Sequence, residues 1–424
     1  MDGKAGESCG NGWTLTEESA RTDVQREQRN AGYGVIYLAA CAIHGTEPER
    51  GRLQQTNLKS LYQMSKKHAL EAIAYMAIES ILAQERDVLF PVERENTRAL
   101  LKRWKKDKAE AICKNLLLDA EREEILRFME KEKIWYLPLK GIILKELYPK
   151  AGMCQMADND ILYDTDGQEK LFAFMTSRGY REVQIKKGNH DIYKKPPVYN
   201  YEMHTSLYGP YSAPGWEAYY ADVKQRLIKD RDKEYGWHFC DEDFYIYFVT
   251  HAYKHYAGGG TGLRSLLDSY VYLRKKRETL HWIYIKAELE KLGIAKFEKQ
   301  FRELGEKVFS IEKAHELEEF QAEEKEMLDY ILFSGTYGTM ENMVKHELEE
   351  MKAAYNISER RAKFKYLKNR ILPDERYFKV QCPFAYRHLW ARPFVLLFRV
   401  IRGVACRREK VWKEWRVLWK RKRK

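Results

Sequence analysis

The sequence lacks the cysteine pattern of a disulfide-bonded or zinc-binding protein. Its seven cysteines are odd in number and widely spaced, and no Cys-x-x-Cys pair occurs. A disulfide scaffold is typical of short secreted chains with an even number of cysteines, and a structural zinc site needs closely spaced cysteine or histidine pairs. We therefore expect free thiols and a reducing compartment, with the cytoplasm as the location.

Long hydrophobic runs are also missing. The two longest apolar stretches, 34–43 and 393–398, are shorter than the roughly 20 residues that a membrane-spanning helix needs. Arg399 and Arg402 interrupt the second stretch, and the first follows a polar, charged segment, which is unlike a secretory signal. The sequence thus predicts no export signal and no integral membrane association.

What the chain does contain is enough apolar material for a core and an excess of positive charge. Of its 424 residues, 44% are hydrophobic and 13% aromatic, which excludes disorder over the whole length. Lys and Arg outnumber Asp and Glu by 75 to 63, giving a net charge of +12. This charge favours a nucleotide, a nucleic acid or an acidic membrane surface as partner, without choosing among them.

Changes in periodicity divide the chain into five parts. Residues 1–54 have weak periodicity and are expected to be poorly ordered, whereas 55–133 has the three- and four-residue spacing of helices. Residues 134–212 contain short alternating strands, 213–392 returns to helix, and 393–424 is a basic, Trp-rich tail helix. The predicted fold class is α+β, with a small mixed sheet flanked by N-terminal helices and a C-terminal helical domain.

Three acidic residues in the predicted sheet suggest a metal site. Asp158 and Asp160 are two residues apart, so on a strand their carboxylates would point to the same face. An adjacent strand could bring Glu202 towards them, with His204 on the same side. Like charges this close need a cation between them, and Mg²⁺ prefers carboxylate oxygens.

A glycine turn precedes these carboxylates. Lys140 and Gly141 stand between a predicted strand and a short predicted helix. Glycine at such a turn lets backbone N–H groups approach a phosphate, and the helix N-terminus favours its negative charge. The order of strand, glycine turn, Asp pair and later Glu suits nucleotidyl transfer, which needs metal ions held firmly against phosphates.

These ordered motifs resemble the uncharacterised nucleotidyltransferase family of bacteria, a branch of the DNA polymerase β-like superfamily. The resemblance rests on residues 139–142, 155–162, 179–181 and 201–204 in the sheet, and on 251–255, 259–264, Asp268 and 333–338 in the helices. It covers roughly residues 55–400 as a whole. The sequence departs from the superfamily pattern at Ile142, where Gly or Ser is usual, and at Cys154, where relatives tend to have Arg.

The resemblance implies a Mg²⁺-dependent nucleotidyltransferase. Asp158 and Asp160 would be the metal pair, Glu202 the third carboxylate, and Lys140 with Gly141 would lie at the triphosphate of an NTP. The acceptor is open, and RNA or tRNA, a protein side chain and a small hydroxyl compound all remain candidates. The two departures leave an alternative, a nucleotide- or RNA-binding protein of the same fold that has lost catalysis.

Further basic residues have both structural and functional interpretations. Arg264 and Asp268, four residues apart on a predicted helix, would form an ion pair, or Arg264 would bind a substrate phosphate. His251 and His255 are more plausible at an interface or near substrate than as zinc ligands. A third, weaker hypothesis is a membrane-surface adaptor that uses the Trp-rich tail.

Overall fold

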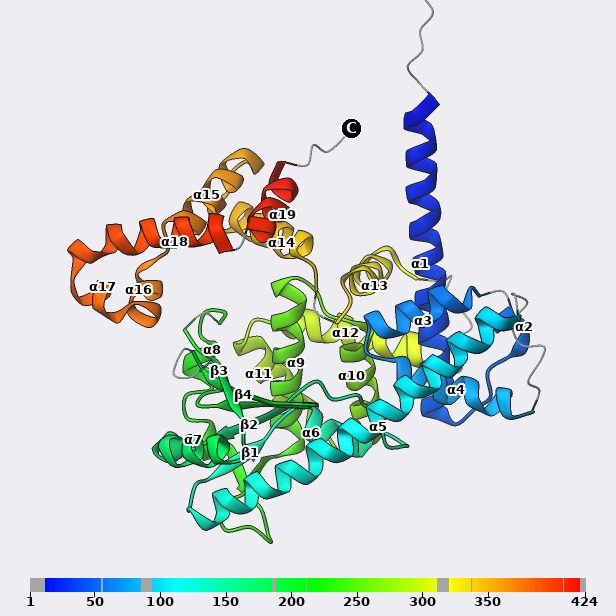
Figure 1. The fold of residues 1–424 in the computed structure, drawn as a ribbon, viewed down its shortest axis with the longest axis horizontal. Helices are drawn as coiled ribbons and strands as arrows, with labels where there is room; N and C mark the ends of the chain where they lie inside the picture. Colours follow the sequence, from blue (N-terminus) through cyan, green and yellow to red (C-terminus); the bar gives the residue numbers. More distant parts are fainter. Residues whose placement is uncertain are drawn as a thin grey trace, which may run out of the picture.

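The computed structural model describes residues 12–54, 56–84, 94–184, 188–210, 212–310, 320–336, 338–406 and 408–419. The chain is a largely helical α+β protein with a small mixed sheet and a C-terminal helical region, as the sequence predicts (Figure 1). None of the helices within these ranges is long and apolar enough to cross a membrane.

The main sheet has five strands in the order β1-β2-β5-β4-β3. Their bounds are β1 Tyr136–Pro138, β2 Asn159–Tyr163, β3 Arg181–Gln184, β4 His190–Lys195 and β5 Tyr199–His204. Strands β2 and β5 are parallel, and the other neighbouring pairs are antiparallel. All five lie within residues 134–212, where the sequence predicts short strands, although its patterning does not identify β4. A separate hairpin, β6 Leu227–Lys229 with β7 Trp237–Phe239, lies outside this sheet.

Alternation along β2 and β5 gives the sheet two different faces. Ile161 and Met203 are fully buried in a cluster with Ile125 of the long helix α5 (Arg94–Lys131) and with Met175 of α7 (Gln168–Ser177). The intervening residues point the other way, since successive side chains on a strand alternate. One face of the sheet therefore supplies a core, and the opposite face carries the acidic side chains.

Two groups of helices surround the sheet. The N-terminal group is α1 Gly12–His44, α2 Arg50–Gln54, α3 Leu58–Lys67, α4 Glu71–Gln84 and α5, and short α6 Gly141–Leu144 follows β1. After α8 Trp216–Tyr219 come α9 Asp241–Gly258, α10 Leu263–Lys276, α11 Trp282–Lys291, α12 Ala295–Phe309 and α13 Ala322–Ser334. One large apolar cluster joins both groups, so the N-terminal helices pack directly on the C-terminal ones.

The N-terminal segment differs from the prediction of poor order over residues 1–54. Helix α1 extends from Gly12 to His44, and its second half is buried, with Val35 and Leu38 fully inaccessible. The Arg29 guanidinium forms two hydrogen bonds, of 2.8 and 2.7 Å, with the Asp329 carboxylate of α13. The apolar run 34–43 is thus a core helix, whose order depends on partners far along the chain. Residues 1–11 lie outside the described residues.

The C-terminal region forms an arm to one side of the body (Figure 1). Its helices are α14 Met340–Tyr355, α15 Glu359–Ile371, α16 Glu375–Gln381, α17 Pro383–Arg387, α18 Arg392–Cys406 and α19 Arg408–Trp419. Val344, Tyr366 and Leu418 bury a small separate core between α14, α15 and α19. The predicted single tail helix over 393–424 is instead two helices, and residues 420–424 lie outside the described residues.

Candidate active site

Strands β2 and β5 bring two of the predicted acidic residues together. Asp160 and Glu202 are direct register partners on these parallel strands. Asp158 is half-buried and lies one residue before β2, rather than within the strand as predicted. Asp160 and Glu202 therefore lie side by side on two central strands, with Asp158 directly before β2.

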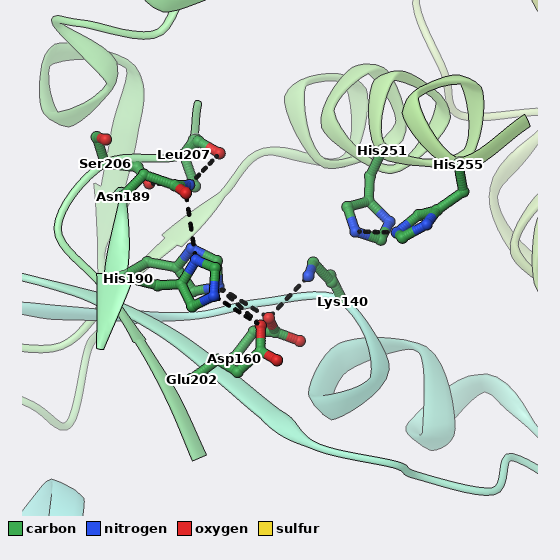
Figure 2. Close-up of polar contacts among 10 residues, drawn as sticks. Lys140, Asp160, Asn189, His190, Glu202, Ser206, Leu207, His251 and His255 are labelled. Carbon is green, nitrogen blue, oxygen red and sulfur yellow. Dashed lines mark hydrogen bonds and ion pairs between the residues drawn. The ribbon is translucent and has the colours of Figure 1, made fainter. Parts of the chain in front are cut away.

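Lys140 closes the turn before α6 in a conformation that L-amino acids rarely adopt. Its φ is +49° and its ψ is −117°, a combination that costs of the order of 1–3 kcal/mol. The Lys140 Nζ donates a 2.7 Å hydrogen bond to Asp160 Oδ1 (Figure 2). His204 Nε2 lies 2.8 Å from the same oxygen. The Lys140 ammonium, which we predicted at the triphosphate, contacts the carboxylate of Asp160 in this structure.

The three carboxyl groups have different electrostatic surroundings. Burial alone would raise the pKa of Asp160, but Lys140 and the hydrogen bond from His204 hold it well below its usual range. Burial and the charge of Asp160 raise the pKa of Asp158. Burial, Asp160 and Asp158 together raise the pKa of Glu202 to about 7. The site thus lacks enough positive charge for three carboxylates, which is the condition under which a bound cation is favoured.

Arg264 of α10 borders the glycine turn. Its Nε lies 3.6 Å from Asp268 Oδ2, so the predicted ion pair forms. Its Nη2 contacts Cys154 Sγ at 3.4 Å, and a Cβ added to Gly141 would stand 3.9 Å from the same Nη2. The Arg264 guanidinium therefore lies next to Cys154 and beside the glycine turn that we predicted to bind phosphate.

Helix α9 places two histidines opposite the sheet. His251 Nε2 and His255 Nε2 are 3.1 Å apart, and Figure 2 shows this pair on the far side of Lys140 from Asp160. Burial and the nearby charge of Lys140 lower the pKa of His251. On the same helix, burial and Lys140 lower the pKa of Lys254. The imidazoles of His251 and His255 are thus hydrogen-bonded to each other.

A histidine that the sequence did not single out completes a possible metal site. Among the described residues, His190, Glu202 and His204 have one ligand atom each within 4.8 Å of one another. His190 begins β4 and pairs with His204 of β5, while its Nε2 is 3.8 Å from Glu202 Oε2. Asp158 and Asp160 are not in this set. His190 was missed because β4 was missed.

One known protein family matches the region that contains these residues. A model of the uncharacterised nucleotidyltransferase family matches residues 54–310, which include the whole main sheet and α9 to α12. Neither the curated proteins nor the solved structures gave a match. The matched region is more than half of the chain and holds every candidate site residue. This chain therefore belongs to the uncharacterised nucleotidyltransferase family and is a transferase enzyme.

Proposed function

We propose that this enzyme transfers a nucleoside monophosphate from an NTP to an acceptor hydroxyl, in a Mg²⁺-dependent reaction that releases pyrophosphate. Residues 134–212 would be its polymerase β-like core. The observation that carries the proposal is the register pairing of Asp160 with Glu202, with Asp158 directly before β2. Two bound Mg²⁺ ions would supply charge neutralisation for the phosphates and activation of the attacking oxygen.

The carboxylates fit such ions. Asp158, Asp160 and Glu202 offer the hard oxygen ligands that Mg²⁺ takes. Burial and the charge of neighbouring carboxylates raise the pKa values of Asp158 and Glu202, and a bound cation would offset both effects. Lys140 holds one Asp160 oxygen in place. A firmly oriented carboxylate loses little freedom when it binds a cation, which is the purpose of preorganisation.

Basic groups at the turn provide a place for the triphosphate. Arg264 lies beside Gly141, and Lys114 Nζ donates a 3.3 Å hydrogen bond to the Ala157 carbonyl, next to Asp158. Guanidinium and ammonium groups in a partly buried site bind phosphate oxygens strongly. We assign Arg264 and Lys114, with the backbone at Gly141, to the phosphates.

Glu202 has a second possible role, as general base. A base works best when its pKa is near the working pH. In the metal-free protein the pKa of Glu202 is about 7, so close to neutral pH it can accept a proton from an acceptor hydroxyl. Glu202 would therefore either complete the metal site or deprotonate the acceptor.

The test is transfer from labelled NTPs. Purified protein would be incubated with each labelled NTP, Mg²⁺ and RNA or cell lysate, and the labelled product would identify the acceptor. We expect RNA because of the net charge of +12. The Asp158→Ala/Asp160→Ala double variant should lose transfer, whereas Asp166→Ala, an exposed aspartate after the same strand, should keep it. Unchanged turnover in the double variant contradicts the proposal.

A nucleotide- or RNA-binding protein without catalysis is the second candidate. It is favoured by the engagement of Asp160 Oδ1 with both Lys140 and His204, which could be a permanent structural network. The outcome that supports it is NTP binding in equilibrium dialysis with no Mg²⁺-dependent incorporation into any acceptor.

A further inference from the structure

The orientation of His190 is fixed by a chain of hydrogen bonds behind it. Asn189 Nδ2 donates to the carbonyls of Ser206, at 3.1 Å, and of Leu207, at 3.2 Å. The amide nitrogen is thereby assigned, because a carbonyl can only accept. Asn189 Oδ1 must then be the atom that faces His190 Nδ1, at 3.2 Å (Figure 2).

This arrangement selects one tautomer of His190. An amide oxygen only accepts hydrogen bonds, so His190 Nδ1 carries the proton and Nε2 keeps its lone pair. That lone-pair nitrogen lies 3.8 Å from Glu202 Oε2, and His204 Nε2 lies 3.9 Å from the same oxygen. Metal-binding histidines characteristically donate their other ring N–H to such an outer partner, which fixes the ring.

We propose that His190, His204 and Glu202 bind a divalent transition-metal ion such as Mn²⁺, Co²⁺ or Zn²⁺. Mg²⁺ takes oxygen ligands, whereas imidazole nitrogens select the transition metals. Bonds of about 2.0–2.1 Å place tetrahedral ligand atoms roughly 3.4 Å apart. The Glu202 oxygen, at 3.8 and 3.9 Å from the two imidazole nitrogens, would therefore approach each of them by about half an ångström.

Binding leaves the proton count of the two imidazoles unchanged. His204 Nε2 would exchange its contact with Asp160 for the metal, and its proton would move to Nδ1, a buried atom without a partner among the described residues. The site therefore deepens the cofactor assignment of the proposed function, since it shares Glu202 with the carboxylate set.

Cobalt(II) tests this site without relying on transfer activity. The full-length protein, freed of metal with a chelator, would be titrated with Co²⁺ while visible absorption and calorimetric binding are recorded. We expect the absorption of a nitrogen-containing site of low coordination number, and an affinity that falls at least tenfold in His190→Ala. Asn189→Ala should weaken binding by about 10–100-fold, because it removes the hydrogen bonds that orient His190 while leaving the three ligands in place.

The control for this experiment is the other histidine pair. His255→Ala disrupts the pair on α9 and should leave the cobalt spectrum as in the wild type. A wild-type spectrum in a folded His190→Ala protein, or the weak spectrum of an all-oxygen octahedral site in the wild type, overturns the proposal. If the protein binds cobalt at this site but transfers no nucleotide, the proposed function is wrong and the metal site stands. If it transfers nucleotide with Mg²⁺ but shows no nitrogen ligation of cobalt, only the metal site is wrong.

Helix α18 in the C-terminal arm carries a row of exposed apolar side chains, which is independent of the metal site. Large apolar side chains follow one face of this helix and the turn before it, all between 56% and 67% exposed: Trp390, Phe394, Leu397, Phe398 and Ile401. Their spacing of three and four residues makes a continuous stripe. Residues 383–406 also contain four arginines and no acidic residue.

We infer that this stripe docks on an anionic membrane surface. An amphipathic helix with aromatic and aliphatic side chains on one face and basic residues beside them lies in the headgroup region of such membranes. Charge complementarity selects anionic lipid, because arginine is the only charged residue type in 383–406. Aliphatic Leu397 and Ile401 favour lipid over RNA, which would use aromatic stacking.

The test is co-sedimentation of the full chain with phosphatidylcholine vesicles, with and without phosphatidylserine. Binding should require phosphatidylserine, weaken with salt, and be lost in Phe394→Ser/Leu397→Ser/Ile401→Ser. Ile283→Ser, an exposed apolar residue on α11, is the matched control. Binding to RNA alone, or a dimer that the triple variant converts to monomer without vesicle binding, overturns the inference.

Discussion

Replacing Glu202 with glutamine should stabilise the metal-free protein at alkaline pH. The folded state raises the pKa of this carboxyl from 4.5 to about 7, through burial and the charges of Asp160 and Asp158. Because the folded state holds the Glu202 proton more tightly, the contribution of this group to the free energy of unfolding is fully present below pH 4.5 and is lost as the pH rises through 7. At about 1.4 kcal/mol per pH unit, the loss is roughly 3 kcal/mol, an upper limit because the side chain is 22% exposed.

The glutamine variant keeps the shape but carries no charge. We therefore expect it to unfold at higher denaturant concentration than the wild type at pH 8, by about 1–3 kcal/mol, and to match the wild type near pH 4.5. Glu182→Gln, an exposed glutamate on β3, should be neutral at both values. The measurement is urea unfolding in the presence of a chelator.

Adding a divalent metal should make the wild type more stable than Glu202→Gln at pH 8. The metal binds the folded wild type and stabilises it by mass action, while the variant has lost one ligand. The reasoning is wrong if Glu202→Gln is no more stable than the wild type at pH 8 without metal, or if the difference between them does not change with pH.

Three further predictions concern stability. His68 is fully buried and burial lowers its pKa to about 3, so stability should fall as pH drops below 6.5, by up to about 1.4 kcal/mol per pH unit, and His68→Gln should lack this slope in urea unfolding. Trp104→Ala should cost about 3–5 kcal/mol in the same assay, because the ring is inaccessible and its Nε1 donates to the Glu71 carbonyl at 2.7 Å. Gly260→Ala should lower the melting temperature, with a cost of about 1–3 kcal/mol or more, because φ is +115° and the new Cβ would stand 2.1 Å from Ser334 Oγ.

The parts of the site on short, apolar strands were predictable from the sequence. Asp160 precedes a buried run and Glu202 stands in an alternating segment, so period-two patterning alone places both. Gly141 does begin a short helix after a strand. What the pattern does not contain is register, and only the pairing of β2 with β5 puts these two carboxylates opposite each other.

The parts that depend on distant partners were not predictable. Strand β4 (His190–Lys195) has three charged residues in six, and its burial comes from β5 and β3 on either side. Helix α1 has too little periodicity to identify, yet Val35 is fully buried by helices from the other half of the chain. In both cases tertiary packing overrides weak local preference, and missing β4 concealed His190.

The two departures from the superfamily pattern have different physical consequences. At Cys154, Arg264 of α10 extends its guanidinium to the cysteine sulfur and to the edge of the glycine turn, so a positive charge stands beside this position. Ile142 is buried in the cluster of Ile161 and Met203 on the core face of the sheet. Its side chain therefore contributes packing to that core. Neither departure removes positive charge or backbone donors from the turn, which favours the enzyme over the catalytically inactive binding protein.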